Sequence, residues 1–215
     1  NIERDSNKFN HIGPFLMNYT TKKEKYFQNA EKANQVFKKI FSNVENPVNK
    51  IKTTISKIFP DYKISGIREN QRNYALCTIR RHENGKSIPL HKDNVSYEGV
   101  EYEVSKINTQ LSCVLHLQET EKGGNLSIYN KRWKKKLEKY REIEFGYNSN
   151  IKKKSLSDTI ETKLGDLVII NPNYLHEVKE IQGISDRVTL GMFFGIENKT
   201  KKIFFWAWYS SKYSK

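Results

Sequence analysis

The 215-residue sequence predicts an α+β fold in which helices come first along the chain and a β-sandwich or jelly roll forms the core. Apolar residues recur at helical spacing in the first third of the chain. Beyond residue 73 they gather instead in short β-rich runs, separated by Gly, Pro, Asn or charged residues. The length and the 36% hydrophobic content are sufficient for one full core, so we expect a single domain over residues 1–215.

Two amphipathic helices are predicted in the N-terminal helical region, residues 1–72. The first lies within residues 21–44, and its apolar stripe is Tyr26, Ala30, Ala33, Phe37, Ile40 and Val44. The second begins at Pro47, a residue favoured in the first turn of a helix, and its stripe is Val48, Ile51, Ile55, Ile58 and Phe59. Because a one-sided apolar stripe needs a surface to cover, we expect both helices to pack on the major sheet.

Short strands are predicted to build the jelly-roll core over residues 73–215. They lie at residues 73–81, 108–118, 125–130, 166–171, 187–194 and 203–209. Cys77 and Cys113, the two cysteines of the chain, each lie alone within such an apolar run. We therefore expect two buried, reduced thiols rather than a disulfide framework or a zinc site.

No stretch of the chain approaches the roughly 18 consecutive apolar residues of a membrane span. The N-terminal residues also lack the basic-then-apolar layout of a secretory signal. These observations predict a soluble, cytoplasmic protein without a membrane partner.

The net charge of +14 is concentrated in one segment. Residues 131–154 hold ten basic and three acidic side chains, which is half of the net charge. Such a cluster attracts polyanions, but here no RNA-stacking signature or recognition-helix pattern accompanies it. We expect residues 131–154 to be a solvated basic insertion in the core, and we do not expect a nucleic-acid partner.

Three side chains form a candidate metal site. His91 and Asp93 are two positions apart, so on an extended strand both side chains leave the same face. His176 follows the predicted strand 166–171 and the turn of residues 171–173. Two imidazoles and one carboxylate form the facial set that holds non-haem iron(II) and leaves coordination positions open for a co-substrate and dioxygen.

Arg187 strengthens this reading, because a His-x-Asp pair alone is weak evidence. In the alternating strand 187–194, Arg187 and Thr189 share one face while Val188, Leu190 and Met192 share the other. A guanidinium beside a hydroxyl is suited to clamp a carboxylate. The alternative is that Arg187 pairs with an acidic side chain at the surface.

The ordered set of these motifs resembles the iron(II)/2-oxoglutarate-dependent oxygenases of the prolyl-4-hydroxylase-like group. The set is His91-x-Asp93, Gly123-Gly124-Asn125-Leu126, Gly165-Asp166-Leu167-Val168-Ile169, His176 and Arg187-x-Thr189. The resemblance implies a double-stranded β-helix, with iron held by His91, Asp93 and His176 and with 2-oxoglutarate and dioxygen as co-substrates. It also implies that Arg187, assisted by Thr189, binds the distal carboxylate of 2-oxoglutarate, and that Gly123 and Gly124 shape a turn near the site.

A closer resemblance is to the small bacterial oxygenases that act on free amino acids. It is carried by residues 87–94, 109–117 and 129–133. That subgroup contains hydroxylases and radical halogenases, and in the halogenases the Asp position is Gly or Ala. Asp93 therefore implies hydroxylation of an unactivated C–H bond of a small molecule, expected to be a free amino acid, with release of succinate and carbon dioxide.

Candidates for substrate contact each have a structural alternative. Arg80 and Arg81 are adjacent and point to opposite strand faces, so at most one of them is expected to grip a substrate carboxylate. Trp206 is a candidate for the roof of the pocket, together with Trp208, although an aromatic C-terminal strand is more often part of the core. His116 shares a strand face with Gln110 and Ser112 and is a further candidate for the cavity lining, although a structural histidine is the favoured interpretation.

Two other functional classes remain open at this stage. The first is a related oxygenase that modifies a macromolecule, protein or RNA, through the basic segment. The second is a non-catalytic jelly-roll module with a metal site, which the Arg187 clamp disfavours. Glu98, Glu101 and Glu103 follow the metal strand and either meet a cationic substrate or are simply solvated.

Overall fold

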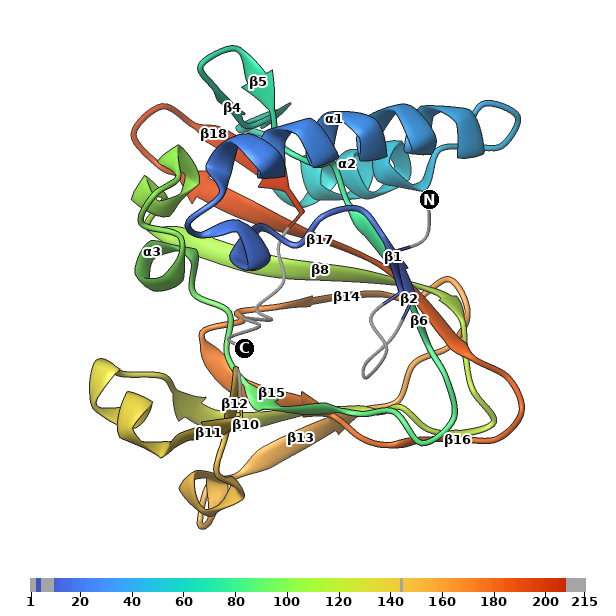
Figure 1. Ribbon diagram of the computed structural model, residues 1–215, viewed down its shortest axis with the longest axis vertical. Coiled ribbons are helices and arrows are strands. Elements are labelled where there is room, and N and C mark those ends of the chain that lie inside the picture. Colours follow the sequence, from blue (N-terminus) through green and yellow to red (C-terminus); the bar gives the residue numbers. More distant parts are fainter. Residues whose placement is uncertain (1–2, 5–9, 144, 208–215) are drawn as a thin grey trace.

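The computed structural model describes residues 3–4, 10–143 and 145–207, which fold into two facing sheets with helices on one side (Figure 1). The larger sheet contains β1 (Glu3–Arg4), β2 (Asn10–Ile12), β3 (Lys63–Gly66), β6 (Thr78–His82), β8 (Thr109–Gln118), β14 (Leu167–Ile170), β17 (Arg187–Glu197) and β18 (Lys202–Trp206). The smaller sheet contains β7 (Ile88–His91), β10 (Leu126–Arg132), β13 (Ser157–Ile160) and β15 (Tyr174–Val178). These two layers confirm the predicted jelly-roll core.

The remaining elements are short and lie in the connections. Three two-stranded ribbons are formed by β4 (Arg68–Glu69) with β5 (Arg72–Asn73), β9 (Lys122–Gly123) with β16 (Ile181–Gln182), and β11 (Arg141–Ile143) with β12 (Gly146–Tyr147). Helical segments of one or two turns are η1 (Leu16–Tyr19), α3 (Val95–Glu98), η2 (Glu103–Lys106), η3 (Lys135–Tyr140) and η4 (Ser149–Lys152).

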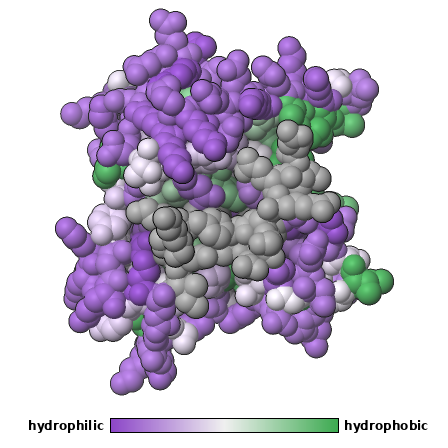
Figure 2. All heavy atoms as spheres, viewed as in Figure 1, coloured by the Kyte–Doolittle hydropathy of each residue, from purple (hydrophilic) through white to green (hydrophobic). Residues whose placement is uncertain are grey.

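Both predicted N-terminal helices are present and cover the outer face of the larger sheet (Figure 1). They are α1 (Lys23–Ile40) and α2 (Pro47–Ile58), and the Asn46 side chain caps α2 by accepting a hydrogen bond from the backbone N–H of Val48 (2.9 Å). The C-terminal half of α1 and the buried stripe of α2 pack on β17 and β18 in one apolar cluster, whose members include Phe37, Ile51, Leu190, Phe194 and Phe205. Tyr26, Phe27 and Ala30 of α1 belong to a second cluster. Hydrophilic residues cover most of the described surface on the face shown in Figure 2.

The first helix is shorter than its apolar stripe predicted. It ends at Ile40, which is 44% exposed, and Val44 lies in the following turn at 61% exposure. The predicted stripe extended to these two residues because it followed the period of the helix, whereas the side chains that pack in the apolar cluster at this end of α1 are Phe37 and Phe41.

The predicted strand 73–81 is interrupted, because Asn73 is the last residue of β5 and β6 begins only at Thr78. Residues 74–77 are not in a strand, because the side chain of Asn34 on α1 binds their backbone. Its amide donates to the carbonyl oxygen of Tyr74 (3.1 Å), and its oxygen accepts from the N–H of Leu76 (2.9 Å). A long-range contact of this kind has no local sequence signal.

The other predicted strands lie within a few residues of β8, β10, β14, β17 and β18. β18 ends at Trp206, and Trp208 lies outside the described residues. Cys77 and Cys113 are buried without a disulfide, and burial raises the pKa of both thiols, which confirms that prediction. No helix in the described part of the chain has the length and apolarity needed to span a membrane.

The segment 131–154 is not simply solvated, which corrects the sequence-based expectation. Trp133, Leu137, Tyr147 and Ile151 are buried in a cluster with residues of the smaller sheet. Lysines such as Lys135 and Lys153 do face solvent. The apolar residues went unnoticed because they are widely spaced among many charges.

Candidate metal centre

The two predicted histidine ligands lie opposite each other on neighbouring strands. His91 is the last residue of β7 and pairs in register with His176 on β15. Both side chains are buried, and their ring centroids are 4.1 Å apart. The antiparallel pairing of β7 with β15 therefore brings together two imidazoles that are 85 positions apart in the sequence.

Asp93 lies just beyond the end of β7, so the prediction that it shares a strand with His91 needs correction. Its backbone N–H donates to the carbonyl oxygen of Pro172 (2.9 Å), in the turn that precedes β15. This hydrogen bond holds Asp93 beside the strand end. Its Oδ2 lies 3.6 Å from Nε2 of His176 and 3.9 Å from Nε2 of His91.

The geometry of the three side chains fits a divalent metal ion. Their candidate ligand atoms all lie within 4.8 Å of one another. Nδ1 of each ring is 2.8 Å from the backbone carbonyl oxygen two residues earlier, that of Pro89 for His91 and that of Tyr174 for His176. A proton on Nδ1 is donated to that carbonyl, which fixes the tautomer and directs the lone pair of Nε2 toward the Asp93 carboxylate.

Burial sets the charge states at this site. Burial and the neighbouring His176 lower the pKa of His91 to about 3, so its ring is neutral at neutral pH. Burial alone would raise the pKa of Asp93, but the adjacent His176, and then His91 and Lys92, bring it below its ordinary value. Oδ1 of Asp93 has no hydrogen-bond partner among the described residues. An ionised carboxylate beside a neutral imidazole is the protonation state that metal binding requires.

The predicted 2-oxoglutarate clamp lies on the cavity side of β17. Arg187 lines the cavity between the two sheets together with the three metal-site residues, and Thr189 lies on the same strand face. Both are buried, and Arg187 Nε and Thr189 Oγ1 have no hydrogen-bond partner among the described residues. Burial and the nearby Arg80 lower the pKa of Arg187 to about 10, so the guanidinium is still charged at neutral pH. A buried cation of this kind is suited to an anionic ligand.

Gly124 provides space for the Arg187 side chain. Its φ of +69° is in the left-handed region, and a Cβ at this position would lie 3.1 Å from Cδ of Arg187. Gly123, with a φ of +76°, leaves even less space for a side chain, because a Cβ there would lie 1.9 Å from the carbonyl oxygen of Glu180. Both glycines thus form the tight turn beside the site that the resemblance implied.

His116 lies in the cavity, although the sequence suggested a structural role. It is 2% exposed on β8 and pairs in register with Thr189. Its Nδ1 contacts the carboxylate of Glu119, and burial and then Arg187 lower its pKa. The shared strand face of Gln110, Ser112 and His116 was the signal that pointed to this position.

The structure separates the three candidate substrate residues. Arg80 is 9% exposed and lines the cavity, where its guanidinium lies against Gly191. Arg81 faces solvent and pairs with Asp186 (2.5 Å), which corrects its assignment as a substrate residue. Trp206 is fully buried behind Phe193 and is not among the described residues that line the cavity. Alternation along the strands puts one of each adjacent pair on the inner face.

Comparisons with known proteins agree with this geometry. The family described as carrier-protein-independent halogenase WelO5 matches residues 3–207. The leucinostatins biosynthesis cluster protein S of Purpureocillium lilacinum is 27% identical over 181 residues, which cover 80% of this chain and 73% of that protein.

Solved structures show the same fold. An N-substituted L-amino acid dioxygenase from Burkholderia ambifaria AMMD, in complex with alpha-KG, has a TM-score of 0.64 and 17% identity, over 89% of this chain and 76% of that chain. HygX from Streptomyces hygroscopicus, with nickel and 2-oxoglutarate bound, has a TM-score of 0.50 and 11% identity, over 94% of this chain and 75% of that chain. The family match over residues 3–207 shows that the chain belongs to the WelO5 halogenase family of iron(II)/2-oxoglutarate-dependent enzymes.

Proposed function

We propose that this enzyme hydroxylates an unactivated C–H bond of a small molecule, and that the substrate is a free amino acid or an N-substituted amino acid. Hydroxylation is favoured by the Asp93 carboxylate, whose Oδ2 lies 3.6 Å from Nε2 of His176 and 3.9 Å from Nε2 of His91. In the radical halogenases that the sequence resembles, this position is Gly or Ala, which opens a site for chloride. In this chain the Asp93 carboxylate occupies the position where chloride would bind, and this favours hydroxylation even though the family is described by a halogenase.

The residues of the cavity have distinct roles in this proposal. Iron(II), when bound, supplies the activation of dioxygen that is coupled to oxidation of 2-oxoglutarate to succinate and carbon dioxide. His91, Asp93 and His176 hold the ion on one side, and Arg187 with Thr189 orients the distal carboxylate of 2-oxoglutarate. Apolar walls formed by Val168, Ile170 and Phe193 exclude water and accommodate the alkyl part of a substrate.

Arg80 supports a substrate that carries a carboxylate. It is a second buried guanidinium in the same cavity, and its register partner on β17 is Thr189 of the proposed 2-oxoglutarate clamp. Gly191 makes room for it, since a Cβ there would lie 2.4 Å from one of its terminal nitrogens. The fold similarity to an N-substituted L-amino acid dioxygenase is consistent with an amino-acid substrate.

The proposed function is tested by the product of the wild-type enzyme. Iron-loaded protein is incubated with 2-oxoglutarate, dioxygen, chloride and a panel of free and N-substituted amino acids, and products are identified by mass spectrometry. We expect succinate together with a product that has gained one oxygen atom. A chlorinated product from the wild-type enzyme would contradict hydroxylation, and an absence of succinate with every substrate class would favour a non-catalytic module.

Arg80→Leu is expected to raise the KM for an amino-acid substrate roughly 10- to 150-fold, because hydrogen bonds to a charged group contribute about 1.5 to 3 kcal/mol. Arg81→Leu is the matched control and is expected to change KM less than about twofold, since its side chain faces solvent. Steady-state kinetics should include the KM for 2-oxoglutarate, because Arg80 lies close enough to Arg187 to influence its charge. Equal effects of the two substitutions on the substrate KM would show that Arg80 does not bind the substrate.

A further inference from the structure

The residues that flank each histidine ligand point away from the cavity and are buried by another part of the chain. Side chains alternate along β7 and β15, so Leu90 and Leu175 face away from the cavity that contains His91 and His176. Lys92 and Glu177, which follow the two histidines, are also buried, at 1% and 8% exposure. The two ligand segments therefore have a covered outer face.

The basic insertion, residues 131–154, provides the apolar part of this cover. Leu90 and Leu175 belong to one cluster of buried residues, whose other members are Tyr129, Trp133, Leu137, Tyr147 and Ile151. The backbone N–H of Trp133 also donates to the carbonyl oxygen of Asn173 (2.8 Å), in the turn before β15. The insertion is thus packed directly against the strands that supply the metal ligands.

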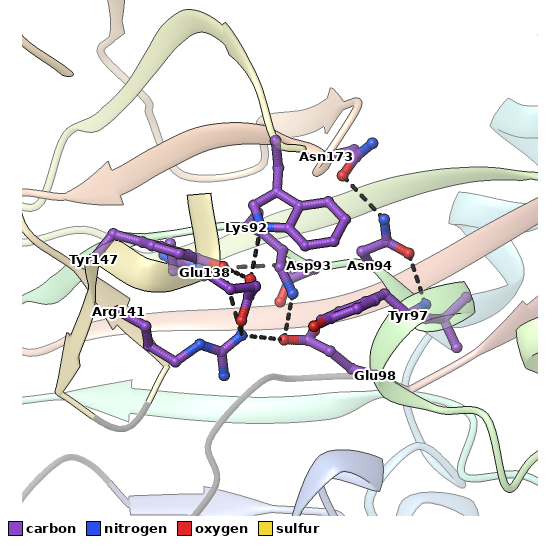
Figure 3. Close-up of polar contacts among 12 residues, drawn as sticks. Lys92, Asp93, Asn94, Tyr97, Glu98, Glu138, Arg141, Tyr147 and Asn173 are labelled. Carbon is purple, nitrogen blue, oxygen red and sulfur yellow. Dashed lines mark hydrogen bonds and ion pairs between the residues drawn. The ribbon is translucent and has the colours of Figure 1, made fainter. Parts of the chain in front are cut away.

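Lys92, between His91 and Asp93, is held by a buried network of charges (Figure 3). Its ammonium group forms an ion pair with Glu98, and Glu98 in turn accepts a hydrogen bond from Arg141 of the insertion (3.0 Å). The ammonium group also lies 4.8 Å from the ring centroid of Trp133 and 5.3 Å from that of Tyr97. Arg141 is therefore connected to the metal-binding segment through one carboxylate.

Glu177, the residue after His176, has an equivalent connection. Lys152 of the insertion donates to its carboxylate at 2.8 Å, and the hydroxyl of Tyr129 donates at 2.7 Å. A carboxylate with 11% side-chain exposure cannot move away from these donors without losing hydrogen bonds that water would only partly replace. Each ligand segment is thus tied to the insertion by one buried charged residue next to a histidine.

We infer that the basic insertion is a structural support for the metal ligands, and that Lys92 and Glu177 are positioning residues through which Arg141 and Lys152 hold the two ligand segments in place. The ligand atoms must be held to within a fraction of an ångström for tight metal binding, and such precision depends on the groups that pack behind them. The inference rests on the triad of His91, Asp93 and His176 and is independent of the choice between hydroxylation and halogenation.

The test compares Lys152→Met and Arg141→Met with Lys153→Met, a matched control at an exposed lysine of the same segment. Co(II) serves as a redox-stable probe, titrated without oxygen and 2-oxoglutarate and followed by its visible absorption, which reports affinity and ligand geometry together. We expect Lys152→Met and Arg141→Met each to weaken Co(II) binding at least roughly 10-fold, the lower end of the effect of outer-shell substitutions. Lys153→Met should stay within about twofold, and Lys152→Arg should bind close to wild type.

Thermal unfolding of the metal-free variants separates support of the metal from general stability. Both altered side chains are 24% exposed, so we expect the variants to fold. Lower unfolding temperatures with wild-type Co(II) affinity and absorption would overturn the inference. If Lys152→Met does not fold, Lys152→Gln keeps a hydrogen-bond donor and is judged by the same affinity criterion. Asp93→Ala tests the metal site itself. Unchanged Co(II) affinity in that variant would mean that the metal does not bind at the triad, which would contradict the proposed function as well as the inference.

Discussion

In chloride-free buffer, replacing Asp93 with Ala is expected to reduce succinate formation and substrate turnover to background and to weaken metal binding, while the protein stays folded. The substitution removes one of three protein ligands but little core volume, and the remaining two imidazoles hold a divalent ion poorly. His176→Ala should behave in the same way. Metal titration, 2-oxoglutarate turnover and a circular dichroism spectrum check this result, and full activity in either folded variant would show that the triad is wrong.

Asp93→Gly extends this prediction to the choice of reaction. The Asp93→Gly substitution should vacate the position that the carboxylate occupies. The chain belongs to a family that is described by a halogenase, so chloride is the ligand to test there. We expect Asp93→Gly to lose hydroxylation, as Asp93→Ala does, and we expect added chloride to restore measurable succinate formation. A chlorinated product, recognised by its isotope pattern, would establish that the carboxylate decides between the two reactions. Wild-type levels of hydroxylation in Asp93→Gly would contradict the role assigned to Asp93.

The second large effect is expected for Arg187→Gln, which should raise the Kd for 2-oxoglutarate roughly 30- to several-thousand-fold. Truncating one partner of a buried charge pair commonly costs about 2 to 5 kcal/mol, and the guanidinium of Arg187 is buried and still charged at neutral pH. The measurement is a direct titration of 2-oxoglutarate into Co(II)-loaded protein. The Co(II) affinity itself should change little, because Arg187 is not a metal ligand.

Arg187→Lys is the conservative control and should recover only part of the affinity. An ammonium group keeps the charge but cannot form the two parallel hydrogen bonds of a guanidinium with a carboxylate. Lys is also shorter and cannot follow the path of the Arg187 side chain past Gly124 to the same point. Unchanged 2-oxoglutarate affinity in both variants would show that Arg187 does not bind the co-substrate. Arg80, the second buried guanidinium of the cavity, would then be the candidate anchor.

Local periodicity was sufficient to predict the main elements. The helix at Pro47 and strands such as β8, β14 and β17 follow directly from the spacing of apolar residues. The short strands β3, β13 and β15 were not among the predicted strands, since they lack the continuous apolar run that marks β14. The segment 74–77 departs from the expected strand for a different reason, because Asn34 on α1 satisfies its backbone groups.

The candidate metal site was predictable because it rests on residue types in a fixed order. His91, Asp93, His176 and Arg187 were identified before any contact between them was known, and the structure brings all four to one cavity. Substrate residues were less predictable. Strand alternation predicted that one of Arg80 and Arg81 faces inward. Which of the two does so depends on the register of β6 with β17, and that register is known only from the paired strands.

The sequence by itself determined the fold class, the helices on the sheet, the candidate metal-binding triad and the candidate guanidinium for 2-oxoglutarate, since each depends on residue identity and local spacing. Tertiary structure alone decided that His116 and Arg80 enter the cavity, that Trp206 remains in the core, and that the basic insertion packs behind the metal ligands. These outcomes depend on which surfaces meet when distant strands pair. A charged segment such as residues 131–154 is indistinguishable from a solvated loop until the partners of its few buried side chains are known.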